Sequence, residues 1–142
     1  MEFYFTLTSE NKLKEISTPV TVAHCDKLCR SEHNCNAIWD TGATSSMISA
    51  AIAKKMTLAP HGSVQIAGVH GVSNAKCYYV DIAFDNGFVI PGIKVSEASD
   101  FGGFDVLIGM DIIGRGKMYI DGTNSKLDVR FYFPIPSAEY KK

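Results

Sequence analysis

Residues 38–43 read Ile-Trp-Asp-Thr-Gly-Ala, so that two apolar residues lead directly into Asp40, Thr41 and Gly42. Neither Asp-Thr-Gly nor Asp-Ser-Gly occurs again in the 142 residues. The short apolar run that ends at Trp39 predicts a buried strand, and the glycine after it predicts a sharp turn that presents the Asp40 carboxylate at the strand end. Because one such carboxylate is half of an acid–base pair, we expect its chemistry to require two copies of the chain.

Length and composition fit a single globular domain covering residues 1–142. Hydrophobic residues make up 46% and charged residues 20% of the chain, and a net charge of -1 offers no electrostatic attraction for nucleic acid. No apolar stretch approaches the roughly 20 residues of a membrane span, and the N-terminus has no basic flank followed by an apolar block. We therefore expect a cytoplasmic protein that binds neither nucleic acid nor membrane.

Strand patterns dominate the rest of the chain. Alternation of apolar and polar residues is typical of half-buried strands, and short continuous apolar runs are typical of fully buried ones. Alternation occurs at residues 3–7, 20–22, 80–84 and 127–133, and continuous runs occur at 88–90 and 106–108. The sequence therefore predicts an all-β fold that closes like a barrel, with the 106–108 strand beside the strand that carries Asp40.

Helices are predicted to be few and short. Ser49 can cap a helical segment in which Ile52 and Met56 share one face. A single helical turn is predicted at residues 111–114, with Asp111 as its N-cap. One or two short helices are thus expected beside the strands.

Two hairpins are predicted from their turn residues. A long hairpin bends at Gly68-Val69-His70-Gly71, where glycines mark the tip. A tighter one is predicted at Asp85-Asn86-Gly87, because Asn-Gly accepts the positive φ angles of a type I′ turn.

Three of these features occur in a characteristic order: the Asp40 stretch, the glycine-tipped hairpin at 68–71, and Val-Leu-Ile-Gly-Met-Asp-Ile-Ile-Gly at 106–114. Together they resemble the retropepsin-like aspartic peptidases, and most of all the small bacterial members, which carry similar Leu-Trp-Asp-Thr-Gly-Ala and Leu-Ile-Gly-Met-Asp-Ile-Ile stretches. The likeness covers roughly residues 36–121. It implies a closed-barrel acid protease fold with a flap hairpin.

The resemblance also implies roles for individual residues. Asp40, Thr41 and Gly42 match the catalytic motif, with Asp40 as the catalytic carboxylate and Thr41 as the hydroxyl that joins the two active-site loops across the dimer axis. Five residues match substrate-binding positions: Ala43, Gly68, Val69, His70 and Gly71. His70 departs from the glycine-rich flap tip of the family.

A second departure concerns the subunit interface. Retroviral members form an ion pair between an Asp directly after Asp-Thr-Gly-Ala and an Arg after the later Ile-Gly. Thr44 and Met110 occupy those positions here. Both halves are absent together, so no buried charge is orphaned, and we expect dimer stability to come from other contacts.

The function expected from this resemblance is that of an aspartic endopeptidase. Two close carboxylates that share one proton can activate water and protonate the leaving amide without a metal or cofactor. We expect a homodimer in which each chain contributes Asp40, acting on a peptide or protein substrate held extended beneath the flaps. Apolar residues near the flap, Ile66, Val69 and Val72, favour hydrophobic residues beside the scissile bond.

Two alternatives to the peptidase remain. The chain could use the same fold as a catalytically silent binding or scaffold protein. It could also be a zinc-stabilised interaction module, because residues 24–35 contain Cys25, Cys29 and Cys35 together with two histidines. That spacing matches no strong zinc pattern, and no cysteine occupies a nucleophile elbow with a paired histidine. We therefore expect no metal ligand among the site residues.

Overall fold

The computed structural model describes residues 2–9, 15–25, 31–68, 71–99, 102–123 and 126–134. Strands make up most of these residues, and the two helices described are short. In chain order the elements are β1 (Glu2–Ser9), β2 (Ile16–His24), β3 (Glu32–Trp39), β4 (Met47–Ser49), α1 (Ala50–Lys55), β5 (Ser63–Gly68), β6 (Gly71–Phe84), β7 (Val89–Ala98), β8 (Val106–Ile108), α2 (Met110–Ile113), β9 (Lys117–Asp121) and β10 (Leu127–Pro134).

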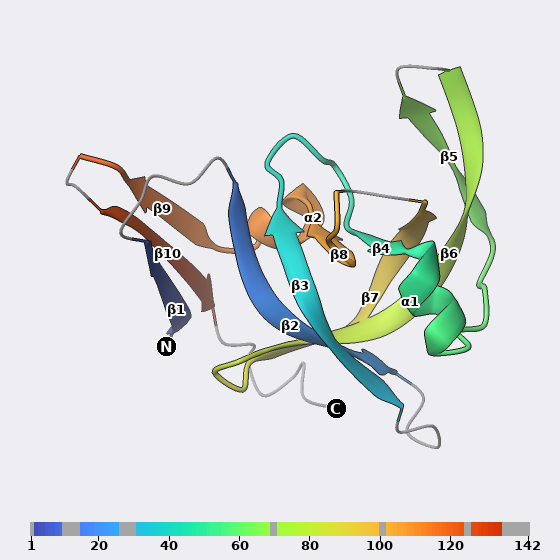
Figure 1. The fold of residues 1–142 in the computed structure, drawn as a ribbon, viewed down its shortest axis with the longest axis horizontal. Helices are drawn as coiled ribbons and strands as arrows, with labels where there is room; N and C mark the ends of the chain where they lie inside the picture. The colour runs from blue at the N-terminus through green and yellow to red at the C-terminus, as the bar shows by residue number, and fades with distance from the viewer. Residues whose placement is uncertain are drawn as a thin grey trace.

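Six strands close into a barrel (Figure 1). They pair in the order β2-β3-β8-β4-β7-β6, and β6 returns to pair with β2. Val20 of β2 lies opposite Cys35 of β3 on one side and Phe84 of β6 on the other. Closure of this kind leaves the barrel strands without free edges. The predicted barrel and the predicted neighbourhood of β3 and β8 are confirmed, since β3 and β8 pair in parallel.

The long predicted hairpin is also present. β5 pairs antiparallel with the first half of β6, from Ser63 opposite Lys76 to Gly68 opposite Gly71. Figure 1 shows the free end of this hairpin standing away from the barrel. The first half of β6 therefore belongs to the hairpin, and its second half belongs to the barrel wall.

The core fills the barrel and continues beneath a second sheet. In β10, Val129, Phe131 and Phe133 alternate with partly or fully exposed residues and are all at least 98% removed from solvent, with Phe131 at 1% exposure. The Phe131 ring packs against Trp39 with ring centroids 4.8 Å apart. Trp39 is 7% exposed and donates its indole N–H to Thr18 Oγ1 over 2.9 Å. The burial predicted for the apolar run that ends at Trp39 is therefore confirmed at Trp39 itself.

The second sheet has three strands in the order β1-β10-β9. β1 pairs with β10 along its whole length, from Glu2 opposite Pro134 to Ser9 opposite Leu127. β9 pairs with β10 on one side only among the described residues. It is thus an edge strand of this sheet.

Helix α1 begins as the sequence predicts. Ser49 is the N-cap, and its hydroxyl accepts a hydrogen bond from the Ile52 N–H over 3.2 Å. Ile52 and Met56 are both buried, at 1% and 4% exposure. Among the described residues, no helix has the length and apolar character required to cross a bilayer.

Two local predictions are wrong. Gly109 is the N-cap of α2, and Asp111 lies in the first turn, where its side chain bonds to another loop. The turn at Asp85-Asn86-Gly87 is not type I′. A type I′ turn needs positive φ at both central residues, and neither Asp85 nor Asn86 has it. Gly87 takes φ 88° after a turn closed by its N–H bond to Phe84 O over 2.9 Å.

Candidate active site

Asp40 stands at the end of β3, where the chain leaves the barrel wall. Its backbone N–H donates to Ile108 O of β8 over 2.9 Å, which continues the parallel pairing by one residue. Ala37 and Trp39 point into the core, whereas Asp40 is half-buried. The strand therefore fixes the backbone of Asp40 and leaves its side chain at the surface of the barrel.

A tight turn orients the carboxylate. Asp40 Oδ1 accepts the Gly42 N–H over 2.8 Å, and the Ala43 N–H donates to Asp40 O over 3.2 Å. A Cβ at position 42 would lie 3.1 Å from Asp40 Oδ1, so glycine permits this close approach. Among the described residues, Asp40 Oδ2 and the Thr41 hydroxyl have no hydrogen-bond partner. The turn holds one carboxylate oxygen and leaves the other available.

The loop after Asp40 is fastened to the segment that follows β8. Ala43 O accepts the Met110 N–H over 2.8 Å, and Thr44 O accepts the Asp111 N–H over 3.1 Å. Ser46, which is fully buried, donates its hydroxyl to Asp111 Oδ1 over 2.7 Å and its N–H to Asp111 Oδ2 over 2.9 Å. The Ser46 hydroxyl also accepts the Gly109 N–H over 3.0 Å.

Gly109 is enclosed by this loop. A Cβ at position 109 would lie 2.8 Å from Ser45 C and 2.9 Å from Ala43 O, both backbone atoms that cannot turn aside. The two stretches that identify the family resemblance, at 38–43 and 106–114, are therefore in backbone contact. Sequence reasoning did not identify Ser46; the available signal was a polar residue immediately before the apolar pair Met47 and Ile48.

A hollow of about 330 Å³ opens beside Asp40, and we refer to it as the Asp40 hollow. The side chains that line it come from the start of β2, the end of β3, β9 and β10: Glu15, Ile16, Trp39, Asp40, Thr41, Met118, Ile120 and Leu127. Ile120 is 56% exposed, which is unusual for a large apolar residue so close to a polar site. One wall of the Asp40 hollow is thus an uncovered apolar surface on the edge strand β9.

The predicted substrate-binding residues fall into two groups. Ala43 lies in the same loop as Asp40, whereas Gly68 and Gly71 face each other at the end of the β5–β6 hairpin. Gly71 has φ 111°, a conformation that side chains rarely adopt. Val69 and His70 lie outside the described residues.

The cysteines do not assemble a metal site in the described part of the chain, where no three His, Cys, Asp or Glu side chains are grouped. Cys25 is exposed and bonds to Tyr79 O over 3.0 Å. Burial, followed by the charge of Asp105, raises the pKa of the Cys35 thiol to about 12. Zinc binding and nucleophilic catalysis both require a thiolate, so the environment of Cys35 opposes both. Cys29 lies outside the described residues.

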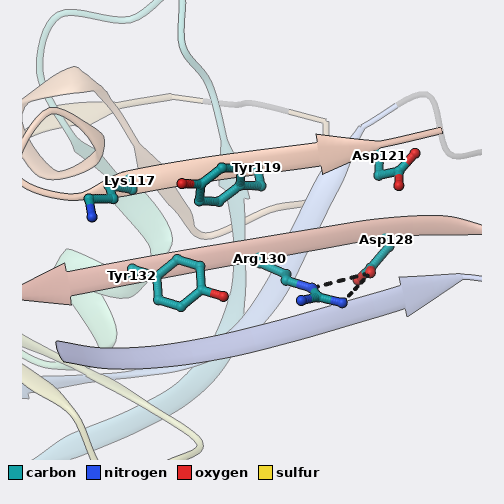
Figure 2. A pocket seen from close by; sticks show the side chains of 6 residues that line it. All are labelled: Lys117, Tyr119, Asp121, Asp128, Arg130 and Tyr132. Carbon is teal, nitrogen blue, oxygen red and sulfur yellow. Dashed lines mark hydrogen bonds and ion pairs between the residues drawn. The ribbon is translucent and has the colours of Figure 1, made fainter. Parts of the chain in front are cut away.

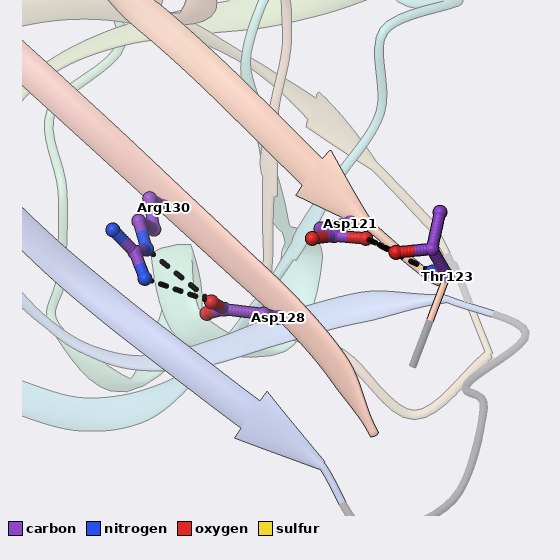
Figure 3. A network of polar contacts seen from close by, with 4 residues as sticks. All are labelled: Asp121, Thr123, Asp128 and Arg130. Atoms are coloured by element: carbon purple, nitrogen blue, oxygen red, sulfur yellow. Dashed lines mark hydrogen bonds and ion pairs between the residues drawn. The ribbon is translucent and has the colours of Figure 1, made fainter. Parts of the chain in front are cut away.

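A second hollow, of about 420 Å³, lies on the other face of the β9–β10 pair (Figure 2). Alternation along β9 places Tyr119 on this face and Ile120 on the face toward Asp40. Arg130 forms an ion pair with Asp128 over 3.1 Å, and the Asp121 carboxylate bonds to the Thr123 hydroxyl over 2.6 Å (Figure 3). The second oxygen of Asp128, Oδ1, is buried without a hydrogen-bond partner among the described residues. This hollow lies on the side of the sheet away from Asp40.

Several solved structures are similar to this chain. A retropepsin-like aspartic protease from Rickettsia conorii has 12% identity and a TM-score of 0.55, covering 94% of this chain and 97% of its own. The protease of EIAV in complex with the inhibitor HBY-793 has 23% identity and a TM-score of 0.51, and the match covers 71% of this chain and 86% of that protease. The retroviral protease-like domain of Ddi1 from Leishmania major has 20% identity and a TM-score of 0.52, and the match covers 90% of this chain and 99% of that domain. At these identities, the likenesses show the fold.

Sequence similarity identifies the family independently. No curated protein matches the chain. Residues 30–115, more than half of its length, match the family described as gag-polyprotein putative aspartyl protease. These residues run from β3 to the end of α2, so they include Asp40 and the segment that fastens its loop. The chain therefore belongs to this family of retropepsin-like aspartic proteases.

Proposed function

We propose that the chain is an aspartic endopeptidase whose catalytic dyad consists of two Asp40 carboxylates, one from each subunit of a homodimer. The observation that carries this proposal is the geometry of Asp40. Its Oδ1 is held by the Gly42 N–H over 2.8 Å, and its Oδ2 has no partner among the described residues. A single chain thus offers one oriented carboxylate, which is half of the required machinery.

The chemistry needs two such groups. Two carboxylates a few ångströms apart cannot both ionise cheaply, so the pair retains one proton between them. The ionised Asp40 accepts a proton from water as it attacks the peptide carbonyl, and the protonated Asp40 of the other subunit donates to the peptide. Oδ2 is the oxygen available for these transfers, because Oδ1 is already engaged by the turn.

The surface around Asp40 supports dimerisation through this side of the molecule. Thr41 presents a hydroxyl without a partner in the described chain, as a contact across a two-fold axis would require. Ile120 exposes apolar surface in the same hollow, on an edge strand that can pair with a second copy. β1 and β9 are the two edge strands of the three-stranded sheet, and we assign the contact to β9 because its Met118 and Ile120 line the Asp40 hollow.

The substrate would lie extended between the Asp40 loop and the β5–β6 hairpin. Gly42 and Ala43 would contact it from the Asp40 loop, and Gly68 and Gly71 at the end of the hairpin would pair with its backbone as a strand does. We propose substrate contact for Val69 and His70 as well, which lie outside the described residues.

Cleavage of a fluorogenic peptide library tests the proposal. The wild-type protein should cleave with a bell-shaped pH dependence, and Asp40→Asn should abolish cleavage while preserving the acceptor for the Gly42 N–H. Asp85→Asn, an exposed change in the β6–β7 turn, is the control with the same loss of charge. Full activity in Asp40→Asn would refute the proposal.

A mixing experiment tests the shared dyad directly. Wild-type protein equilibrated with a large excess of Asp40→Asn should lose activity, because most wild-type chains then have an inactive partner. Undiminished activity in the mixture would show that one chain suffices. Peptide binding without any cleavage by the wild-type protein would favour the alternative of a catalytically silent binding protein.

A further inference from the structure

A third hollow, of about 230 Å³, lies between the Asp40 loop, the β5–β6 hairpin and β7. We refer to it as the Lys94 hollow. Its lining residues are Ser45, Ser46, Val64, Cys77, Lys94, Val95, Ser96 and Asp111. Ser45 belongs to the loop that begins at Asp40, and Val64 belongs to β5 of the hairpin. The Lys94 hollow therefore borders the path proposed above for an extended substrate.

Three hydrogen-bond donors in the Lys94 hollow are unused. Lys94 is exposed on β7 and forms no ion pair or hydrogen bond with its side chain in the described structure. The hydroxyls of Ser45 and Ser96 likewise have no partner there, although Ser96 is only 7% exposed. One ammonium and two hydroxyls on residues that line one small space suit a carboxylate, which accepts several hydrogen bonds on two oxygens.

Asp111 also lines the Lys94 hollow, but its carboxylate does not pair with Lys94. Asp111 accepts hydrogen bonds from the Ser46 N–H, the Ser46 hydroxyl and the Ile112 N–H, at 2.7 to 3.0 Å. Its carboxylate is thus engaged by neighbouring donors and forms no ion pair with Lys94 within the described chain. The positive charge of Lys94 remains available to a ligand.

The other walls are apolar. Cys77, opposite Ser96 on the neighbouring strand, is 1% exposed, and Val64 is half-buried. Such walls favour the methylene groups of glutamate over the shorter stem of aspartate, because apolar stem surface leaves water when it packs there.

We propose that the Lys94 hollow is a substrate subsite for a glutamate side chain and that Lys94 is its specificity-determining residue. The inference rests on the proposed peptidase function and adds to it a substrate class, namely peptides with an acidic residue near the scissile bond. It differs from the preference predicted from the apolar residues of the hairpin, which concerns the positions that flank the bond itself.

The test uses pairs of fluorogenic peptides that differ only by Glu or Gln, scanned through the four positions on each side of the scissile bond. At one position the wild-type protein should favour Glu by about tenfold in kcat/KM, as expected for a hydrogen-bonded charge. Lys94→Gln should bring the ratio of Glu to Gln close to one, and Lys94→Glu should favour Lys over Glu. Lys54→Gln, which removes a charge from α1 instead, should leave the ratio unchanged.

A binding measurement separates this inference from the peptidase proposal. Fluorescence anisotropy with the Asp40→Asn protein reports affinity for intact Glu and Gln peptides whether or not the wild type cleaves them. A Glu preference in affinity that Lys94→Gln removes supports the subsite, even if no peptide is cleaved. Equal affinity for Glu and Gln peptides at every position overturns the subsite, even if the wild type is an active peptidase.

Discussion

Asp111 and Ser46 are joined by two hydrogen bonds, from the Ser46 hydroxyl to Oδ1 over 2.7 Å and from the Ser46 N–H to Oδ2 over 2.9 Å. The two residues lie 65 positions apart in the chain. Ser46 in turn accepts the Gly109 N–H, so a single polar cluster connects the Asp40 loop, the end of β8 and α2. The position of Asp40 therefore depends on this cluster as well as on β3.

Asp111→Asn should destabilise the protein. An amide has one acceptor oxygen, so it cannot receive both hydrogen bonds from Ser46 as the carboxylate does. Leaving a buried donor unsatisfied costs about 1–3 kcal/mol, and we expect a loss of this size in the free energy of unfolding measured with urea. Asp85→Asn should change the free energy of unfolding little, because Asp85 is exposed. Equal stabilities for the two variants would contradict the structural role assigned to Asp111.

Gly109→Ala should destabilise more than Gly42→Ala. The added methyl at 109 would lie 2.8 to 2.9 Å from backbone atoms of Ser45 and Ala43, and the loop would have to move. At 42 the nearest atom is the Asp40 side-chain oxygen at 3.1 Å. Overpacking of a tight site costs about 1–3 kcal/mol, and we expect Gly109→Ala to fall in that range by urea unfolding. If Gly109→Ala left the free energy of unfolding unchanged, the loop around Gly109 would have to be able to move without cost.

Ile120→Lys should weaken the proposed dimer. A charge on this edge of β9 would have to be desolvated when a second copy covers the Asp40 hollow, so we expect the Kd for dimerisation to rise about tenfold or more. Sedimentation equilibrium measures this Kd. Val89→Lys is the matched control, because Val89 is 44% exposed and lies at the start of β7 beside the β6–β7 turn. A dimer that tolerates Ile120→Lys as well as Val89→Lys does not use this surface.

The barrel could be predicted from the sequence because alternation along a strand reports which side chains face the core. β10 shows this clearly, since its alternating Val129, Phe131 and Phe133 are the buried residues. The pairing of β3 with β8 was also predicted, because both are short apolar runs that end in a glycine-containing turn. Residues 38–43 were sufficient to predict that Asp40 stands at a strand end.

The polar contacts of the site could not be predicted in this way. No periodic pattern connects Ser46 with Asp111, and the N-cap predicted for Asp111 was wrong because its carboxylate bonds to a distant loop instead. The Lys94 hollow likewise collects residues from separate segments that only the closed barrel brings together. The type I′ turn failed for a local reason, since the left-handed conformation is taken by Gly87 alone.

Cys35 should resist alkylation in the folded protein. Burial and the charge of Asp105 raise its pKa to about 12, so the thiol stays protonated and unreactive at pH 8, where an ordinary cysteine is partly ionised. Iodoacetamide labelling followed by peptide mass spectrometry should therefore modify the exposed Cys25 well before Cys35. In urea, where burial is lost, the two should react at similar rates. Rapid labelling of Cys35 in the native protein would show that its thiolate is accessible, and would reopen the zinc-bound alternative for residues 25–35.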